Sequence, residues 1–219
     1  MSGGRGLHDT YRRLHAAFGP QGWWPGETAF EVLVGAVLTQ NAAWSNVERA
    51  IQGLRNACLF APERIVAAEH GALAAAIRPS GYFNVKARRL RAACEAWLEH
   101  GGEAGLARLD TATLRARLLA VKGLGRESVD DVVLYAFERP VFVVDAYTRR
   151  IFSRLGVLAG DEPYETIRAR FEAALPQDPA LFNEYHALIV ALGKDICRPR
   201  RPRCDECPLQ AGCAFAGGP

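Results

Sequence analysis

The chain has 219 residues, of which 49% are hydrophobic and 23% are charged, and its formal net charge is +3. This is enough apolar material for one large or two small domains. The sequence contains no apolar run of the roughly 20 residues that span a bilayer, and its first residues lack the apolar stretch of a signal peptide. We therefore expect a protein of the cytoplasm, a reducing compartment, with no membrane association.

Hydrophobic periodicity predicts helices along nearly the whole chain, and so an all-α fold. Thr28 and Glu31 have the spacing of a capping box before an apolar segment. Asn84 is predicted to cap a long helix that stops at Gly101 and Gly102. No internal repeat is present. The predicted helices cover residues 32–38, 43–57, 62–68, 71–77, 84–99, 104–108, 113–120, 126–137, 145–155, 163–174 and 178–193.

Four of the six cysteines lie close together near the end of the chain, with the spacing C-x6-C-x2-C-x5-C. Such a cluster in a reducing compartment indicates a metal site rather than disulfides. Four thiolates suit either tetrahedral zinc or an iron–sulfur cluster, although zinc ribbons usually have two C-x2-C pairs. The other two cysteines have apolar neighbours and are predicted to be buried core thiols. The cluster consists of Cys197, Cys204, Cys207 and Cys213; the core thiols are Cys58 and Cys94.

A glycine turn between two predicted helices is the strongest sign of ligand binding. Gly123 and Gly125 leave backbone N–H groups accessible, and a helix begins directly after them, so the turn can bind one phosphate. The carboxylate of Asp145 follows Gly125 by twenty residues and ends the apolar run 141–144. Taken alone, such a glycine pair can be a tight turn and such an aspartate a helix cap. Their order and spacing together favour a phosphate site followed by a catalytic acid.

This arrangement resembles the endonuclease III-like helix-hairpin-helix (HhH-GPD) DNA glycosylase superfamily over about residues 20–213. The likeness is closest to the 3-methyladenine DNA glycosylase branch, although well-known members of that branch lack the cysteine cluster. The segments that carry it are Trp-Trp-Pro at 23–25, Gly-Ala-Val-Leu-Thr-Gln-Asn at 35–41, Arg-Pro-Ser-Gly-Tyr-Phe-Asn-Val-Lys-Ala at 78–87 and Lys-Gly-Leu-Gly-Arg-Glu-Ser at 122–128.

The resemblance implies a two-lobed fold with the active site between the lobes. One lobe is a six-helix barrel domain over 24–133 that contains the hairpin. The other combines 1–23 with 134–219. Its cysteine segment, 197–213, matches the [4Fe–4S] loop of endonuclease III, which favours that cluster over zinc. We expect a monomer that acts on double-stranded DNA containing a damaged base and associates with the nucleoid.

An enzyme that acts on a base inside a duplex must extrude it and fill the gap. By the resemblance, Gln40 inserts into the vacated stack and Tyr82 separates the opposite strand; alternatively, Gln40 only ends a helix and Tyr82 is a half-buried core residue. Basic residues follow the first cluster cysteine and can hold phosphates, unless they only form a solvated loop. The predicted DNA-binding residues are Gln40, Tyr82, Gly123, Gly125, Arg126, Arg198, Arg200, Arg201 and Arg203.

Asp145 is the candidate catalytic residue, because an ionised carboxylate stabilises the oxocarbenium character that develops on the sugar and can orient water. Glu127 stands where bifunctional relatives have the lysine that attacks the sugar. A carboxylate cannot form a Schiff base, so lyase activity is expected to be weak or absent.

Tryptophans near the start of the chain suggest the base. Electron-rich indoles bind cationic rings, and N-alkylated purines such as 3-methyladenine are cationic. The resemblance places Trp23, Trp24, Pro25 and Trp44 in the base pocket. Core packing is the alternative for the tryptophans.

Three other functions remain open from the sequence. They are an endonuclease III-like glycosylase for uracil, mismatched thymine or oxidised pyrimidines, a non-catalytic damage-binding protein, and a ferredoxin-like electron carrier. Glu184 and His186 are possible cleft residues of unknown role.

Overall fold

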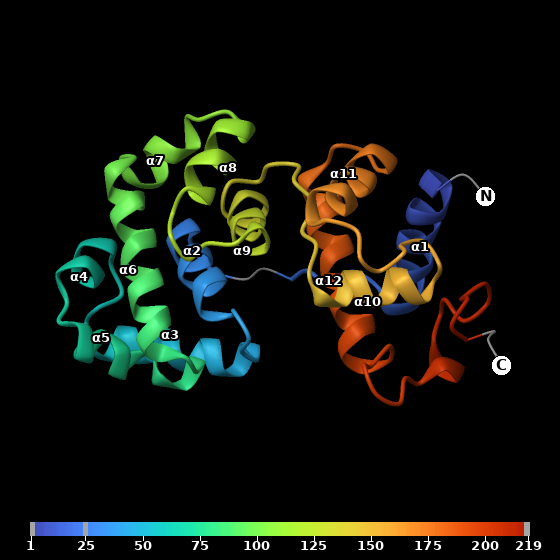
Figure 1. Ribbon diagram of the computed structural model, residues 1–219, viewed down its shortest axis with the longest axis horizontal. Coiled ribbons are helices and arrows are strands. Elements are labelled where there is room, and N and C mark those ends of the chain that lie inside the picture. The colour runs from blue at the N-terminus through green and yellow to red at the C-terminus, as the bar shows by residue number, and fades with distance from the viewer. Residues whose placement is uncertain (1–2, 24–25, 217–219) are drawn as a thin grey trace. The chain divides into compact units, whose positions relative to one another are not determined.

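The computed structural model describes residues 3–23 and 26–216, with side chains from residue 6 onward, and divides the chain into two compact units. Unit 2 comprises residues 24–137, and unit 1 combines 1–23 with 138–219. Helices form both units, and the described residues contain no strand, which confirms the all-α prediction (Figure 1).

Unit 2 is built around helix α2, which is buried along almost its whole length and packs against α3, α6, α9 and the π-helical turn η2. The sequence predicted one helix over 126–137, whereas α9 gives way to the wider turn η2, whose first four residues are all buried. The elements of unit 2 are α2 (Ala29–Leu38), α3 (Trp44–Asn56), α4 (Pro62–Ala67), α5 (His70–Ala76), the 3-10 turn η1 (Arg78–Ser80), α6 (Phe83–Glu99), α7 (Gly102–Ala107), α8 (Thr111–Leu119), α9 (Arg126–Asp131) and η2 (Val132–Ala136).

Two helix starts in unit 2 test the capping predictions. The Thr28 hydroxyl accepts the Glu31 N–H at 3.1 Å, as predicted, while the Glu31 carboxylate accepts from the Glu27 N–H instead of completing the box on Thr28. The prediction that Asn84 caps α6 is wrong. Tyr82 precedes that helix in a left-handed backbone conformation, and Asn84 lies within its first turn.

Unit 1 consists of four main helices and the cysteine segment. An aromatic core holds them together, in which the Phe142 and Phe171 rings stack at 4.2 Å and the Tyr185 hydroxyl donates to the Leu7 carbonyl at 2.7 Å. Gly193 allows α12 to approach α10, since a Cβ there would lie 2.3 Å from Tyr147 Cδ1. The elements are α1 (Gly3–Phe18), α10 (Ala146–Arg154), α11 (Tyr164–Ala174), α12 (Pro179–Asp195) and the 3-10 turn η3 (Cys204–Glu206).

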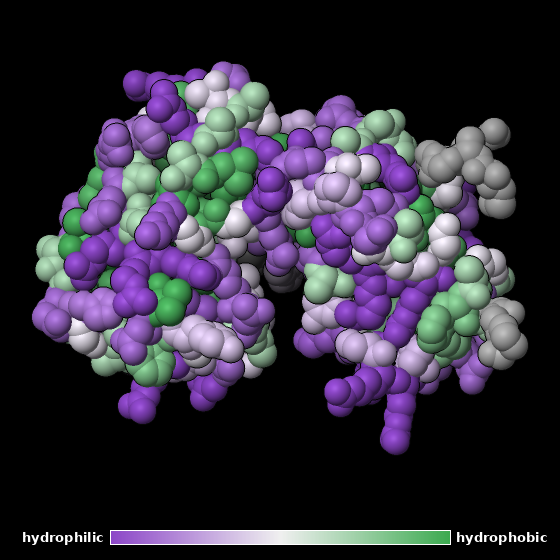
Figure 2. All heavy atoms as spheres, viewed as in Figure 1, coloured by the Kyte–Doolittle hydropathy of each residue, from purple (hydrophilic) through white to green (hydrophobic). Residues whose placement is uncertain are grey.

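The surface of both units is largely hydrophilic on the face shown in Figure 2. Within the described ranges, no helix has the length and apolar character needed to cross a bilayer. Cys94 is buried, as predicted, but the prediction of a buried Cys58 is wrong. Cys58 follows α3 with a φ of 56° and is exposed, because the helix ends just before it and turns the chain outward.

Candidate active site and DNA-contacting elements

Asp145 stands at the junction between a buried extended segment, 141–144, and helix α10. Its Oδ1 accepts two hydrogen bonds from Thr148, at 2.7 Å from the backbone N–H and at 2.8 Å from the hydroxyl, so the residue is the N-cap of α10. Its Oδ2 lies 3.5 Å from His186 Nε2. One carboxylate oxygen therefore fixes the helix while the other faces an imidazole.

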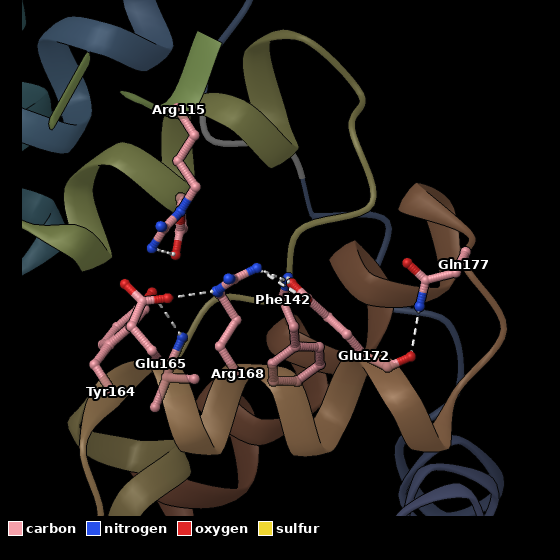
Figure 3. Close-up of polar contacts among 9 residues, drawn as sticks. Arg115, Phe142, Tyr164, Glu165, Arg168, Glu172 and Gln177 are labelled. Carbon is pink, nitrogen blue, oxygen red and sulfur yellow. Dashed lines mark hydrogen bonds and ion pairs between the residues drawn. The ribbon is translucent and has the colours of Figure 1, made fainter. Parts of the chain in front are cut away.

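The segment leading to Asp145 is held by side chains of α11 (Figure 3). The Phe142 N–H donates to Glu172 at 3.0 Å, and the Val144 N–H donates to the Tyr164 hydroxyl at 3.4 Å. Arg168 fixes Glu172 through an ion pair of 2.7 Å. Because an extended segment without a partner strand needs side-chain acceptors for its N–H groups, α11 determines where Asp145 lies.

The charge of Asp145 is stabilised inside the protein. Burial acts to raise the pKa of Asp145, but the nearby His186 and the two hydrogen bonds from Thr148 outweigh it and lower the pKa below its ordinary value. The Trp23 ring lies 6.2 Å from the His186 ring, centroid to centroid. The structure thus places both Trp23 and Asp145 next to His186, a residue of unknown role in the sequence analysis.

The glycine turn lies between α8 and α9, as predicted. Gly123 has a φ of 104°, and a Cβ there would lie 2.4 Å from Arg89 Cγ, so glycine is required at this position. Gly125 caps α9 with open space where a Cβ would point. A buried ion pair between Arg115 Nε and Asp130 Oδ1, at 2.6 Å, fixes α8 on α9 (Figure 3). Two predicted residues, Arg126 and Glu127, are exposed in the first turn of α9.

Gln40 lies just after α2 and is bonded to the hairpin. Its amide nitrogen donates to the Gly123 carbonyl at 3.1 Å and to the Ser128 hydroxyl at 3.0 Å, and Arg89 donates to its amide oxygen at 2.5 Å. In this structure the Gln40 side chain is therefore directed at protein groups, and insertion into DNA would require it to exchange those bonds.

Tyr82 is 72% exposed, so the alternative that it is a half-buried core residue is wrong. Trp44 is half-buried at the start of α3 and lines a surface pocket with three glutamates and Arg55, which pairs with Glu31. The predicted pocket residues Trp24 and Pro25 lie outside the described residues.

The four cysteines of the cluster segment line one cavity and form no disulfide. Where the structure is described, no three His, Cys, Asp or Glu side chains are grouped so as to hold a metal ion. Two arginines of α10 that the sequence analysis missed hold the cysteine segment in place. Arg154 donates to Cys197 Sγ at 3.3 Å and to the Arg198 carbonyl at 2.8 Å. Arg150 donates to the Cys197 carbonyl at 2.9 Å. Their four-residue spacing was the only sequence signal, because it places both on one helix face.

The basic residues of this segment are exposed, and hydrophilic side chains stand out over the chain that follows α12 (Figure 2). Arg203 pairs with Glu206, whereas no ion pair is found for the other predicted phosphate contacts among the described residues. The latter are Arg198, Arg200 and Arg201.

This geometry can be compared with known proteins. Residues 34–177 match the family described as the HhH-GPD superfamily of base excision DNA repair proteins. The chain belongs to this superfamily. The prediction of a DNA glycosylase of the base excision repair superfamily is confirmed at that level.

Individual relatives cover most of the chain. It is 44% identical over 210 residues to a Methanocaldococcus jannaschii protein named as a putative DNA repair glycosylase, covering 94% of this chain and 95% of the relative. It is 30% identical to an endonuclease III of Sulfolobus acidocaldarius, covering 85% of this chain and 82% of the relative. A crystal structure of H. pylori 3-methyladenine DNA glycosylase bound to 1,N6-ethenoadenine matches with a TM-score of 0.75 and 27% identity, covering 89% of this chain and 98% of that one.

Proposed function

We propose that this protein is a monofunctional DNA glycosylase that removes alkylated purines, such as 3-methyladenine, from double-stranded DNA. The observation that carries the proposal is the grouping of Trp23, His186 and Asp145, in which an aromatic ring and an ionised carboxylate both lie next to one imidazole. The 3-methyladenine glycosylase of H. pylori, similar in both fold and sequence, supports the same substrate class.

Asp145 supplies the chemistry in this proposal. As the bond between base and sugar lengthens, positive charge develops on the sugar, and a carboxylate that is already ionised stabilises that charge without reorganising. The Oδ1 atom is held by Thr148, so Oδ2 is the oxygen that faces the reaction. His186 orients Oδ2 and keeps the carboxylate ionised.

The substrate class follows from the leaving group. An N-alkylated purine is cationic and departs readily, so it needs stacking and one carboxylate more than a strong general acid. A cation–π contact is worth about 0.5–2 kcal/mol. Trp23, whose ring lies 6.2 Å from the His186 ring, is proposed to offer such a contact.

Glu127 explains the monofunctional character. Strand nicking needs a lysine that attacks the sugar, and this position has a carboxylate instead. Lys86 cannot replace it easily, because its side chain is buried and its amine is bonded to two carbonyls.

The cysteine segment is proposed to hold a [4Fe–4S] cluster. Its four thiols line one cavity. The segment has one C-x2-C pair where zinc ribbons usually have two, which favours a cluster over one zinc ion. A bound cluster would cross-link the four cysteines. Arg150 and Arg154 connect the cysteine segment to α10, the helix that Asp145 caps. The ligands would be Cys197, Cys204, Cys207 and Cys213.

DNA binding is proposed to use the hairpin turn, the exposed arginines and the two inserting residues. The chain is proposed to act as a monomer in a reducing cytoplasm, near the nucleoid. The DNA-contacting set is Gln40, Tyr82, Gly123, Gly125, Arg126, Arg198, Arg200, Arg201 and Arg203.

The decisive experiment measures base release from duplex DNA methylated with dimethyl sulfate, with products separated by chromatography and strand nicking scored in parallel without alkali. We expect free 3-methyladenine or 7-methylguanine and no nicking. Release of methylated bases together with nicking would refute the monofunctional assignment. Absence of methylated products would refute the substrate.

The second candidate is an endonuclease III-like glycosylase for uracil, mismatched thymine or oxidised pyrimidines, favoured by the 30% identity to the Sulfolobus acidocaldarius endonuclease III. Oligonucleotides containing those bases separate the two candidates directly. A chain that binds all these substrates and releases no base would instead be a damage-binding protein.

A further inference from the structure

Three described non-glycine residues of unit 2 have left-handed backbone conformations, and two of them, Asn41 and Tyr82, belong to the elements proposed to enter DNA; the third is Cys58. Asn41, directly after Gln40, has a φ of 54°, and Tyr82 has a φ of 45°. Non-glycine residues adopt such angles uncommonly, asparagine more often than tyrosine, and keep them where the surroundings hold them. A group that holds the chain near both residues would therefore stabilise both turns.

Lys86 is that group. Its amine donates to the Leu38 carbonyl and to the Ser80 carbonyl, each at 2.7 Å, and the residue is only 1% exposed. Leu38 is the last residue of α2, two before Gln40. Ser80 lies two residues before Tyr82, at the end of η1. One buried cation thus joins the bases of the two turns.

A lysine suits this position for physical reasons. The last carbonyls of a helix have no partner within it, and positive charge near them is favourable. An ammonium group has three donors that can be directed at carbonyls of different segments. A buried charge would be costly if it served only to fill space.

We infer that Lys86 is a positioning residue that presents Gln40 and Tyr82 to DNA as one rigid unit. The inference rests on the part of the proposed function that assigns these two residues to insertion. It does not depend on which base is removed.

The test uses duplex DNA that carries a tetrahydrofuran abasic analogue with 2-aminopurine in the opposite strand, whose fluorescence rises when it is unstacked. No bond is broken in this assay, so failure of catalysis or of the substrate assignment does not affect it. Wild type should raise the fluorescence. Lys86→Met should reduce the rise about tenfold, because it removes both hydrogen bonds that hold the two turns, and losing such bonds typically changes an equilibrium by about that factor. Binding to undamaged DNA should stay near wild type.

Lys194→Met is the matched control, because Lys194 is exposed on α12 in unit 1. It should behave as wild type. A full fluorescence rise with Lys86→Met would overturn the inference. A full rise with Tyr82→Ala would overturn both the inference and the assignment of Tyr82 to insertion.

A second measurement applies even if Lys86→Met does not fold. Gln40→Ala and Tyr82→Ala are compared singly and together in the same assay. If the two side chains act as one unit, the double variant should depart from the product of the single effects by about threefold or more. Independent effects would overturn the inference.

Discussion

Replacing Asp145 by asparagine separates its two roles, as helix cap and as charge. Asparagine keeps an oxygen for the Thr148 bonds, and it is as good an N-cap as aspartate. We expect Asp145→Asn to lower the free energy of unfolding by less than about 1 kcal/mol. Asp145→Ala removes the cap, which costs about 0.5–2 kcal/mol. It also leaves buried polar groups of Thr148 and His186 without the carboxylate, which adds about 1–3 kcal/mol.

The expected effect on base release has a different pattern. Both variants remove the carboxylate that stabilises positive charge on the sugar. Losing one preorganised electrostatic group typically costs about 2.7–4 kcal/mol of transition-state stabilisation, or about 100- to 1,000-fold in rate. Asparagine and alanine should therefore lose activity to a similar extent while differing in stability.

Three measurements check this prediction: the rate of base release in a single turnover, the free energy of unfolding in urea, and the affinity for DNA that contains an abasic analogue. Binding by Asp145→Asn should stay within about twofold of wild type, since the helix that it caps remains in place. If Asp145→Asn releases bases at a near wild-type rate, or loses binding and base release equally, Asp145 acts as a structural cap and the proposed mechanism fails.

Three further predictions concern buried groups. Burial, with smaller contributions from Glu63 and Glu95, raises the pKa of Cys94 to about 12. Iodoacetamide at pH 8 should therefore label the exposed Cys58 and leave Cys94 unlabelled until the protein unfolds, which peptide mass mapping measures. Arg115→Met leaves the fully buried Asp130 without its ion pair and should lower the free energy of unfolding by about 3–5 kcal/mol, whereas a loss below about 1 kcal/mol would show that the pair is dispensable. Burial and the nearby Arg89 lower the pKa of Lys86 to about 8, against an ordinary 10.5. Between these two pH values the unfolded chain binds one more proton than the folded chain, so the free energy of unfolding should rise with pH in wild type relative to Lys86→Met. Equal pH profiles of the two proteins would contradict the shift.

Local patterns in the sequence were sufficient for the helices and for the order of the motifs. The Thr28 hydroxyl caps α2 as expected, since a cap depends on residues three positions apart. The Asn84 prediction failed because tertiary contacts restrain the turn before α6: Lys86 donates to the Ser80 carbonyl and also to the Leu38 carbonyl, 48 positions away, and Tyr82 takes the left-handed conformation that starts the helix. Local propensity cannot anticipate such a restraint.

The candidate site shows the same division. Local sequence patterns were enough to locate the hairpin glycines, the cysteine cluster and Asp145 at the start of a helix. The partners of the polar side chains follow from the packing of distant segments. Gln40 meets Ser128 across 88 positions of sequence, and the Asp145 carboxylate meets His186 on another helix. These partners depend on which helix faces pack together. The apolar periodicity of a helix predicts which of its faces is buried, but it does not predict which segment packs against that face.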